Sequence, residues 1–309
     1  MKLRILEKKD IPLMLEWMHD EESLQYFRFD TVHMTEEKAA AFIENSQTEE
    51  NRHYAVAGDA DEYLGTISLK QIDRDSGSAE YAVVLRKCAR GNGTAADAAD
   101  ALMRLAFGEL GLNRIYLNVY RDNARAIRFY EKLGFVRFGE TERIRDAAGE
   151  EKELIWYEFR KEDFVDSRFC YLRSFAERGD ARGQLVALEG GMDVPFEIRR
   201  LFYIYGTEDN IARGNHANRK SSFLFVCLNG SVKIELDDGS RRDTVVLEQK
   251  NRALVMPAMI WKRMYDFSRD AVLLVLSDAH YDAEEYIKDY EEFIREINQM
   301  RGSARQRGK

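Results

Sequence analysis

The sequence predicts two domains: an N-terminal domain of mixed α/β (α+β) structure, followed by an all-β domain that ends in a helix. The chain has 309 residues, and a globular domain commonly takes ~100–200 residues. Hydrophobic residues make up 45%, enough for two cores. Near residue 165 the pattern changes from helices mixed with strands to short strands separated by turns. We place the domains at 1–163 and 168–298 and expect a basic, flexible tail at 299–309.

Hydrophobic periodicity defines the elements of the first domain. The strongest is a helix over 94–110, because Ala98, Leu102, Met103 and Ala106 fall on one broad face. In chain order we expect a strand at 2–7, a helix opening at 10–12, a helix at 35–46, strands at 53–57, 63–70 and 79–85, the helix at 94–110, a strand at 114–120, a helix at 123–133, and strands at 135–138 and 154–159.

Short strands and tight turns predict the second domain. Between residues 170 and 276 we expect no helix of about ten residues or more. Asn229-Gly230 is a strong hairpin signal, because both residue types accept the positive φ of a tight turn. This pattern is typical of a β-sandwich or barrel, and an amphipathic helix is expected at 282–299. The expected strands include 198–205, 223–228, 232–236, 244–247 and 272–276.

Composition excludes several classes of function. The formal net charge is −8, and residues 1–165 hold the acidic excess, with 24 basic and 32 acidic residues. A nucleic-acid-binding protein would show a basic footprint instead. No run approaches the ~20 apolar residues of a membrane span, and the N-terminus carries no secretory signal. Cys88, Cys170 and Cys227 have neither disulfide nor metal-ligand spacing. We therefore expect a cytoplasmic protein without nucleic-acid or membrane partners.

Two motifs in the first domain carry chemistry. Residues 90–95 read RGNGTA and lie between a strand and the long helix. Successive backbone N–H groups at a helix N-terminus form an anion site, and glycines let a phosphate approach the main chain. The second motif is N-x-x-A-x-x-x-Y-x-x-x-G-F, from Asn123 to Phe135. Its Ala126 and Tyr130 share one helix face, where a tyrosine hydroxyl can protonate a leaving thiolate.

Together these motifs resemble the GNAT N-acetyltransferase family over about residues 1–162. Arg90, Gly93 and Ala95 match the family's R-x-x-G-x-G/A pyrophosphate motif. The resemblance implies acetyl-CoA as the cofactor and direct attack of an amine on the thioester, with a base that accepts the ammonium proton. The cofactor-binding residues it implies are Val84, Leu85, Arg90, Gly91, Gly93, Thr94, Ala95 and Asn123.

The catalytic candidates of this domain are Tyr130 and Glu80. The resemblance makes Tyr130 the general acid. Glu80, on the strand before the glycine-rich turn, is our candidate base, acting directly or through water. Each residue has a plainer interpretation: Glu80 as a solvated strand carboxylate, Tyr130 as a core aromatic, and Asn123 as a helix N-cap, a role compatible with contact to the cofactor.

The second domain carries a histidine in an extended segment. Residues 213–220 read RGNHANRK, and alternation along a strand puts His216 and Asn218 on one face. One histidine with no carboxylate in the next ten residues argues against a metal site. A structural histidine is the alternative to a catalytic one.

His216 belongs to an ordered array of motifs that resembles the WxcM-like family of sugar-nucleotide 3,4-ketoisomerase cupins over about residues 168–295. The resemblance implies a cupin (jelly-roll) domain that moves the ketone of dTDP-4-oxo-6-deoxyglucose from C4 to C3 without metal. That reaction is proton abstraction next to a carbonyl, and His216 matches the family's first histidine. The array comprises PFEIRR at 195–200, RGNHA at 213–217, LNGSV at 228–232, W-x-x-M-Y-D-F at 261–267, YD at 281–282 and YI at 286–287.

The chain departs from this family at three positions. Asn218 replaces the second histidine of H-A-H, Lys262 replaces the histidine of W-H-E-M, and Arg182 stands where some members place a tyrosine near the sugar. One base suffices if it shuttles the proton between neighbouring carbons. Surface charge and core packing are the alternatives for the charged and aromatic candidates. The predicted substrate-binding residues are Arg182, Tyr203, Tyr205, Arg213, Asn218, Lys220, Trp261 and Lys262.

We therefore expect a bifunctional enzyme of nucleotide-sugar and surface-polysaccharide biosynthesis. It would isomerise a dTDP-4-oxo-6-deoxyhexose and N-acetylate an amino-sugar nucleotide, with a dTDP- or UDP-linked sugar as its ligand and a homodimer formed through the cupin domain. Two alternatives stay open. One is an amino-sugar N-acetyltransferase whose cupin domain only binds sugar nucleotide or dimerises. The other is a protein N-acetyltransferase with an interaction module.

Overall fold

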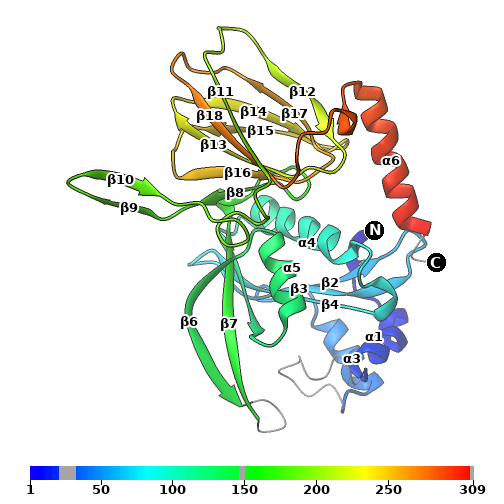
Figure 1. Cartoon of the computed structure of the whole chain (residues 1–309). Coiled ribbons are helices and arrows are strands. Elements are labelled where there is room, and N and C mark those ends of the chain that lie inside the picture. The colour runs from blue at the N-terminus through cyan, green and yellow to red at the C-terminus, as the bar shows by residue number, and fades with distance from the viewer. Residues whose placement is uncertain (21–32, 146–149, 307–309) are drawn as a thin grey trace. The chain divides into compact units, whose positions relative to one another are not determined.

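The computed structural model describes residues 1–20, 33–145 and 150–306. The chain divides into two compact units, Met1–Glu162 and Asp163–Ser303, and each has its own sheets and its own buried core (Figure 1). Within the described ranges, no helix combines the length and the apolar character needed to cross a membrane.

A seven-stranded sheet forms the centre of the first unit, in the order β1-β2-β3-β4-β5-β7-β6. Neighbouring strands are antiparallel except β4 and β5, which are parallel. The strands are β1 (Lys2–Ile5), β2 (Arg52–Ala57), β3 (Tyr63–Asp73), β4 (Ser78–Leu85), β5 (Arg114–Tyr120), β6 (Val136–Arg145) and β7 (Glu151–Arg160).

Strands β4 and β5 diverge after a short paired segment. Residues 78–80 of β4 pair with residues 114–116 of β5, although β4 continues to Leu85 and β5 to Tyr120. Beyond the paired segment, the edge of β4 that faces β5 has backbone groups that the sheet does not use. The sheet therefore opens directly before the glycine-rich turn.

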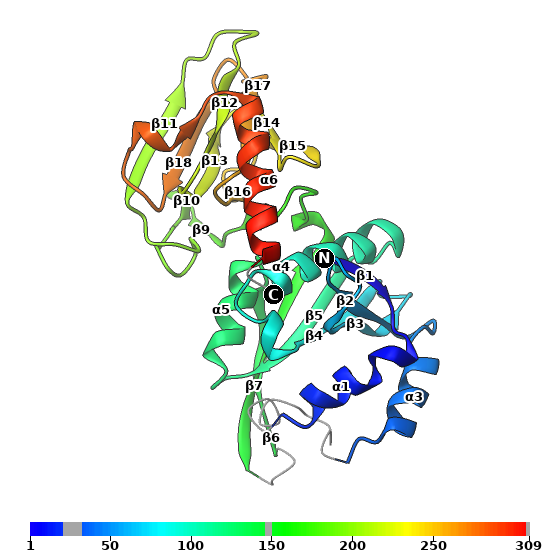
Figure 2. The same ribbon diagram turned by 90° about the vertical axis from the view of Figure 1, so that its right-hand side faces the viewer.

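Helices cover both faces of this sheet. Met14, Trp17 and Ile43 of the first two helices pack with Tyr63 and Val84 on one face, while α4 and α5 lie on the other (Figure 2). The helices are α1 (Ile11–Met18), α3 (Glu36–Glu44), α4 (Thr94–Arg104), which continues as a π-helical turn (Leu105–Glu109), and α5 (Ala124–Lys132).

Two five-stranded antiparallel sheets form the second unit, in the orders β11-β18-β13-β16-β8 and β15-β14-β17-β12-β19. A further hairpin pairs β9 with β10. The strands are β8 (Tyr171–Ser174), β9 (Glu177–Asp180), β10 (Gly183–Val186), β11 (Arg200–Tyr205), β12 (Arg213–Asn218), β13 (Phe223–Asn229), β14 (Val232–Asp237), β15 (Arg242–Leu247), β16 (Arg252–Met256), β17 (Trp261–Tyr265), β18 (Val272–Ser277) and β19 (Tyr286–Ile287).

Apolar side chains of both sheets meet in one core, which includes Phe225, Ile234, Leu254 and Leu273. Helix α6 (Tyr290–Gln306) packs on the outside, where its Phe293 joins a separate small cluster with Ala217 and Trp261. An α/β unit followed by a two-sheet β unit with a final helix confirms the predicted fold class.

The C-terminal helix differs from the prediction. It begins at Tyr290 rather than 282, because Asp282 caps a short 3-10 turn and residues 286–287 pair with β12 as a strand. Asp289 then accepts a hydrogen bond from the Glu292 amide and opens the helix. The helix continues to Gln306, so residues 299–306 of the predicted tail are helical; residues 307–309 lie outside the described residues.

Candidate active sites

The glycine-rich turn of the first unit contains two residues with a left-handed backbone conformation. Gly91 has φ of +80° and Gly93 of +91°, a region that glycine enters without strain. A Cβ atom placed at either residue would meet nothing within 4 Å, so the space above the turn is open. Gly93 is also the N-cap of α4, which places the turn at the positive end of the helix dipole.

This turn presents backbone donors to the open space. Within the described ranges, the amides of residues 91–93 and of Ala95 have no protein acceptor. The Arg90 Nε donates to the Leu85 carbonyl at 2.8 Å and braces the turn against the end of β4. Unpaired amides at a helix N-terminus suit phosphate oxygens. The residues predicted to hold a pyrophosphate therefore fit that group.

Asn123 and Tyr130 lie on the same helix. The Asn123 Oδ1 accepts from the Ala126 amide at 3.1 Å, so the N-cap interpretation of Asn123 holds. The half-buried Tyr130 ring lies 5.9 Å from the Tyr81 ring and 5.7 Å from the Phe135 ring. Burial raises the pKa of Tyr130. Its phenol therefore keeps its proton at neutral pH and can only donate it.

Glu80 lies where β4 and β5 separate. Its Oε1 accepts from Lys70 Nζ at 2.9 Å, and its side chain is 17% exposed, so it is not a freely solvated carboxylate. Successive residues of a strand point to opposite faces. Because Tyr81 packs against Tyr130, the Glu80 side chain lies on the opposite face of the sheet from Tyr130.

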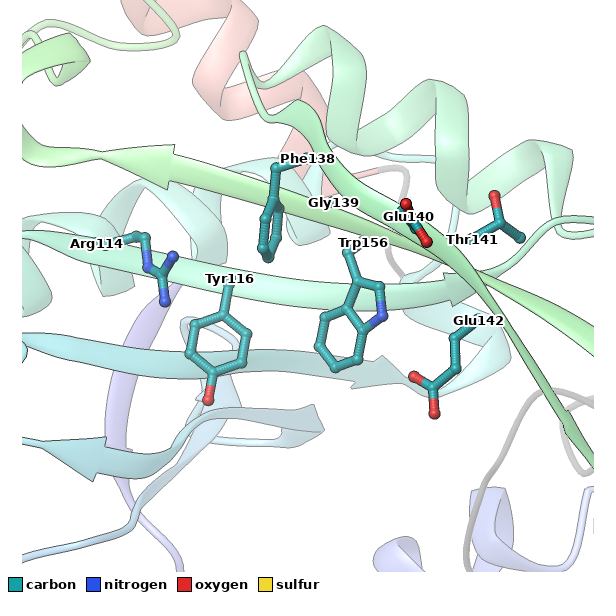
Figure 3. A pocket seen from close by; sticks show the side chains of 8 residues that line it. All are labelled: Arg114, Tyr116, Phe138, Gly139, Glu140, Thr141, Glu142 and Trp156. Carbon is teal, nitrogen blue, oxygen red and sulfur yellow. The ribbon is translucent and has the colours of Figure 1, made fainter.

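A pocket of about 530 Å³ lies on the sheet formed by β5, β6 and β7 (Figure 3). Its Tyr116 pairs with Glu80 of the neighbouring strand β4. Tyr116 and Trp156 lie 6.2 Å apart between ring centroids, and Glu140 and Glu142 of β6 also line the pocket. Arg114 already lies over the rings of Tyr116 and Phe138, and Trp156 together with the two carboxylates suits a cationic amine. The sequence missed this pocket, because β6 was expected to end at residue 138. Its lining residues are Arg114, Tyr116, Phe138, Gly139, Glu140, Thr141, Glu142 and Trp156.

The second unit contains a pocket of about 250 Å³ between its two sheets. Among the predicted residues, His216, Lys262, Arg213 and Tyr203 line it. Its lining residues are Phe202, Tyr203, Ile204, Arg213, Gly214, His216, Phe223, Phe225, Lys262, Met264 and Tyr286.

A β-bulge aims His216 into this pocket. The register between β12 and β17 shifts between Gly214 and His216. Gly214 has φ of +90°, and a Cβ atom there would lie 2.8 Å from the Lys262 carbonyl oxygen, so only glycine fits. After the bulge, His216 pairs directly with Lys262 across the two strands, and neighbouring side chains on one face of such a pair lie close together.

His216 is held as a neutral imidazole. Its Nδ1 lies 2.9 Å from the Gly214 carbonyl oxygen. Because a carbonyl only accepts, Nδ1 carries the hydrogen and Nε2 keeps its lone pair. Burial, and then the charge of Lys262, lower the pKa of His216 to about 4. The ring also packs 4.7 Å from Tyr286. A fixed, unprotonated Nε2 facing a pocket is a candidate general base.

Lys262 begins a chain of buried polar groups. Its Nζ donates to Asn218 Oδ1 at 2.6 Å, and Asn218 Nδ2 donates to Glu285 Oε1 at 3.2 Å. The Glu285 carboxylate also accepts from the amide and hydroxyl of Ser221. Lys262, Asn218 and Glu285 are all buried. Burial lowers the pKa of Lys262 to about 7, although the Glu285 charge acts against this shift.

The structure does not bring five predicted substrate-binding residues to this pocket. Asn218 lies behind Lys262, and the Lys220 amide donates to Glu285 while its side chain is exposed. Strand alternation turns Trp261 outward, where it packs on Tyr290 and Phe293 of α6.

Tyr205 and Arg182 also lie elsewhere. Tyr205 is exposed and packs 5.8 Å from Tyr203, which is itself 60% exposed at the pocket border. The inward residues of β11 are Phe202 and Ile204. Arg182 lies in the β9–β10 hairpin and pairs with Asp180.

The sequence also missed residues around this pocket. Glu285 ends a short 3-10 turn and Tyr286 begins β19, in a stretch that was expected to be helical. Arg200 of β11 lies over the rings of Phe202 and Tyr281. Its Nε and one Nη are buried without a hydrogen-bond partner in the described residues, an arrangement that an anionic ligand would satisfy. The described residues contain no group of three His, Cys, Asp or Glu side chains placed to bind a metal.

Comparisons with known proteins match each unit to a different family. The family model of the acetyltransferase (GNAT) domain matches residues 1–136, and the WxcM-like C-terminal model matches residues 167–298. The TDP-4-oxo-6-deoxy-α-D-glucose-3,4-oxoisomerase of Aneurinibacillus thermoaerophilus is 40% identical over 118 residues, which are 38% of this chain and 85% of that protein.

Relatives of the first unit are acetyltransferases. An uncharacterised N-acetyltransferase of Bacillus subtilis (strain 168), YokL, is 30% identical over 39% of this chain and 68% of its own. The spermidine N(1)-acetyltransferase of Escherichia coli (strain K12) is 28% identical over 45% of this chain and 74% of its own.

The solved structure of WlaRA, a TDP-fucose-3,4-ketoisomerase from Campylobacter jejuni, is 41% identical, with a TM-score of 0.41 over 42% of this chain and 96% of that one.

The chain therefore belongs to the GNAT acetyltransferase family through its first unit and to the WxcM-like family through its second. These matches confirm both family resemblances that were inferred from the sequence. The chain combines acetyltransferase and sugar-ketoisomerase enzyme families, and acetyl-CoA is the cofactor of the first.

Proposed function

We propose, from this double family membership, that the chain is a bifunctional enzyme of nucleotide-sugar biosynthesis. Its second unit would be a TDP-4-oxo-6-deoxyhexose 3,4-ketoisomerase, and its first unit an N-acetyltransferase of an amino-sugar nucleotide. The observation that carries the proposal is the neutral His216, fixed by the Gly214 carbonyl beside Lys262 in a pocket between the sheets. The 40% identical relative from A. thermoaerophilus acts on TDP-4-oxo-6-deoxyglucose.

His216 would move the carbon-bound proton. Its Nε2 takes the proton from C3 of the sugar, and that electron pair forms the C3–C4 double bond of an enediol. The imidazolium then returns the proton to C4, which leaves the ketone at C3. A histidine with a lowered pKa starts this cycle unprotonated at neutral pH. Arg213 at the pocket and Arg200 nearby supply positive charge for the diphosphate.

In the first unit, residues 91–95 would hold the pyrophosphate of acetyl-CoA, with Val84, Leu85 and Asn123 along its arm. The bound cofactor supplies the activated acetyl group. Tyr130 holds a proton at its phenol oxygen for the departing sulfur, and Glu80, fixed by Lys70, accepts the proton of the attacking amine.

The two activities make chemical sense in one chain. Ketoisomerisation yields a 3-oxo sugar, a separate amination would convert that ketone to an amine, and N-acetylation would then give an acetamido sugar for surface polysaccharide. We further propose that the chain acts in the cytoplasm, as a homodimer formed through the second unit, with functional domains at 1–163 and 168–298.

Product analysis tests the proposal. The full chain is incubated with TDP-4-oxo-6-deoxyglucose and the product identified by NMR, while release of CoA from acetyl-CoA is measured with TDP- and UDP-linked amino sugars. We expect a TDP-3-oxo-6-deoxyhexose and CoA release with at least one amino-sugar nucleotide. An unchanged oxo sugar at high enzyme concentration would refute the isomerase, and CoA release with peptides alone would favour a protein N-acetyltransferase.

A polyamine is a second candidate acceptor. The pocket on β5, β6 and β7 combines Trp156 with Glu140 and Glu142, which suits an extended cation. The E. coli relative with 28% identity is a spermidine N(1)-acetyltransferase. The same CoA-release assay with spermidine decides: faster release with spermidine than with any amino-sugar nucleotide would make the polyamine the acceptor.

A further inference from the structure

Lys262 occupies the place in the second pocket where a second acid–base group is needed. Moving a ketone from C4 to C3 shifts one proton from C3 to C4 and one from O3 to O4, and each shift takes one removal and one delivery. His216 accounts for the carbon-bound proton. Asn218, which stands where the family's second histidine stands, has no titratable group and does not line the pocket. The oxygen-bound proton therefore needs another carrier.

The pairing of β12 with β17 provides such a proton carrier, Lys262. Lys262 pairs directly with His216, both side chains line the same pocket, and the Lys262 Nζ lies 5.0 Å from the centre of the Phe223 ring. An ammonium has three N–H donors. One donates to Asn218 Oδ1, and in the described part of the chain the other two have no acceptor. A buried ammonium with unused donors at a pocket wall is placed to donate to an oxygen of a bound ligand.

We propose that Lys262 is the second catalytic residue of this pocket and carries the proton between the two oxygens of the substrate, with Asn218 and Glu285 as the positioning residues behind it. This inference rests on the proposed ketoisomerase activity and assigns its oxygen chemistry. It also explains the departure from the family. The catalytic group at the pocket is a lysine on β17, and Asn218, at the position of the second histidine, holds that lysine in place.

The cycle balances with two residues. Neutral His216 takes the C3 proton while the Lys262 ammonium gives a proton to O4, and the C3–H electron pair becomes the C3–C4 double bond as the C4–O double bond opens. The neutral Lys262 amine then takes the proton from O3. The C3–O double bond forms, the C3–C4 pair takes the proton from the His216 imidazolium at C4, and both residues return to their starting states.

The charged and titratable groups around Lys262 come from three elements. Glu285, from the turn before β19, raises its pKa, whereas Arg200 from β11 lowers it. The third, His216 of β12, is neutral while its pKa stays near 4. With burial dominating, the pKa of Lys262 falls to about 7, so the residue can both give and take a proton near neutral pH. Activity should therefore fall as the pH rises above about 7 and Lys262 loses its starting proton.

Lys262→Met and Lys262→Arg test the inference in the full chain. Methionine keeps the length without a charge, and arginine keeps the charge but does not titrate in this range. Kinetics with TDP-4-oxo-6-deoxyglucose are measured from pH 5.5 to 9, beside Lys250→Met, which alters an exposed lysine in a turn of the same unit. Thermal unfolding and binding of TDP show whether each variant is folded.

We expect both Lys262 variants to bind TDP. Their kcat should fall at least ~100-fold, as for loss of a general acid. The activity that is left should no longer decline as the pH rises above 7. Lys250→Met should match the unsubstituted chain. If the unsubstituted chain isomerises and Lys262→Arg retains its rate and its pH profile, this inference is wrong while the proposed function stands. If the unsubstituted chain itself fails to isomerise, the proposed function fails, and the inference with it.

Discussion

The two candidate sites are built from different material. The acetyl-CoA site of the first unit is a run of backbone amides on one contiguous turn, residues 91–95, at the start of α4. The pocket of the second unit is lined by residues of five strands, β11, β12, β13, β17 and β19, with His216 and Lys262 as its ionisable centre and Glu285 behind them. A backbone site depends on glycine and on the helix, whereas a side-chain site depends on long-range contacts.

This difference has a consequence for pH. Backbone amides do not titrate, so the anion site of the first unit keeps its donors at any physiological pH. The second pocket instead buries a histidine and a lysine whose pKa values burial shifts to about 4 and about 7. Its chemistry and its stability should therefore both depend on pH.

Replacement of His216 should have the largest effect. His216→Ala removes the only base that we place at C3, so isomerisation should fall by ~10³-fold, within the range for loss of a general base. Acetyl transfer should be unchanged, because the two units have separate sites. Rates of product formation and of CoA release on one preparation check this. A parallel loss of both activities would show that the units are not independent.

Tyr130→Phe is the matching test of the first unit. It keeps the ring that packs on Tyr81 and Phe135 but removes the proton, so kcat for acetyl transfer should fall by ~10²-fold, with isomerisation unaffected. Tyr81→Phe is the control, because its hydroxyl is buried without a hydrogen-bond partner in the described residues. Equal losses in the two variants would mean that packing, and not the Tyr130 proton, matters.

Acid should destabilise the second unit through His216. Its folded pKa of about 4 lies below the ordinary histidine value of 6.5, so between these values the unfolded chain binds a proton that the folded chain does not. Stability should therefore fall as the pH drops from 6.5 to 4, by about 2 kcal/mol after allowance for partial exposure. Urea unfolding at several pH values checks this. His216→Gln should lack most of the decline; an equal decline would exclude His216 as its source.

Alanine substitution of two matched glycines should have the smallest effect on stability, and each variant serves as a control for the other. Gly93 and Gly111 both have positive φ, and a Cβ atom at either would meet nothing within 4 Å. Alanine at either position should cost about 1 kcal/mol in stability through backbone strain. Only Gly93→Ala should also raise KM for acetyl-CoA, because its methyl group enters the space above the turn. A rise of equal size in Gly111→Ala would point to general destabilisation.

Features that follow from short sequence patterns could be predicted. The glycine-rich turn at 90–95 and the helix from Asn123 to Tyr130 each occupy one short stretch of chain, and local geometry determines them. The two-unit fold followed from hydrophobic periodicity and from the change near residue 165. His216 at a pocket followed from strand alternation and from family resemblance.

Features that depend on distant contacts could not be predicted. Glu285 supports Asn218 from 67 positions away, and nothing local marks it. The partners of the outward-facing Trp261, Tyr290 and Phe293, lie on α6, which begins eight residues later than expected. The pocket on β5, β6 and β7 needs the polar extension of β6 to Arg145, a stretch without the alternation that identifies a half-buried strand.

The central claim is that the second pocket is catalytic although Asn218 replaces a family histidine. The most direct measurement is ¹H NMR of TDP-4-oxo-6-deoxyglucose with the full chain in D₂O, following the proton on C3. We predict that the C3 signal disappears at a rate that depends on enzyme concentration, and that His216→Ala abolishes the loss. A C3 signal that persists at substantial enzyme concentration, in a preparation that binds TDP, would contradict the claim and leave the second unit a binding module.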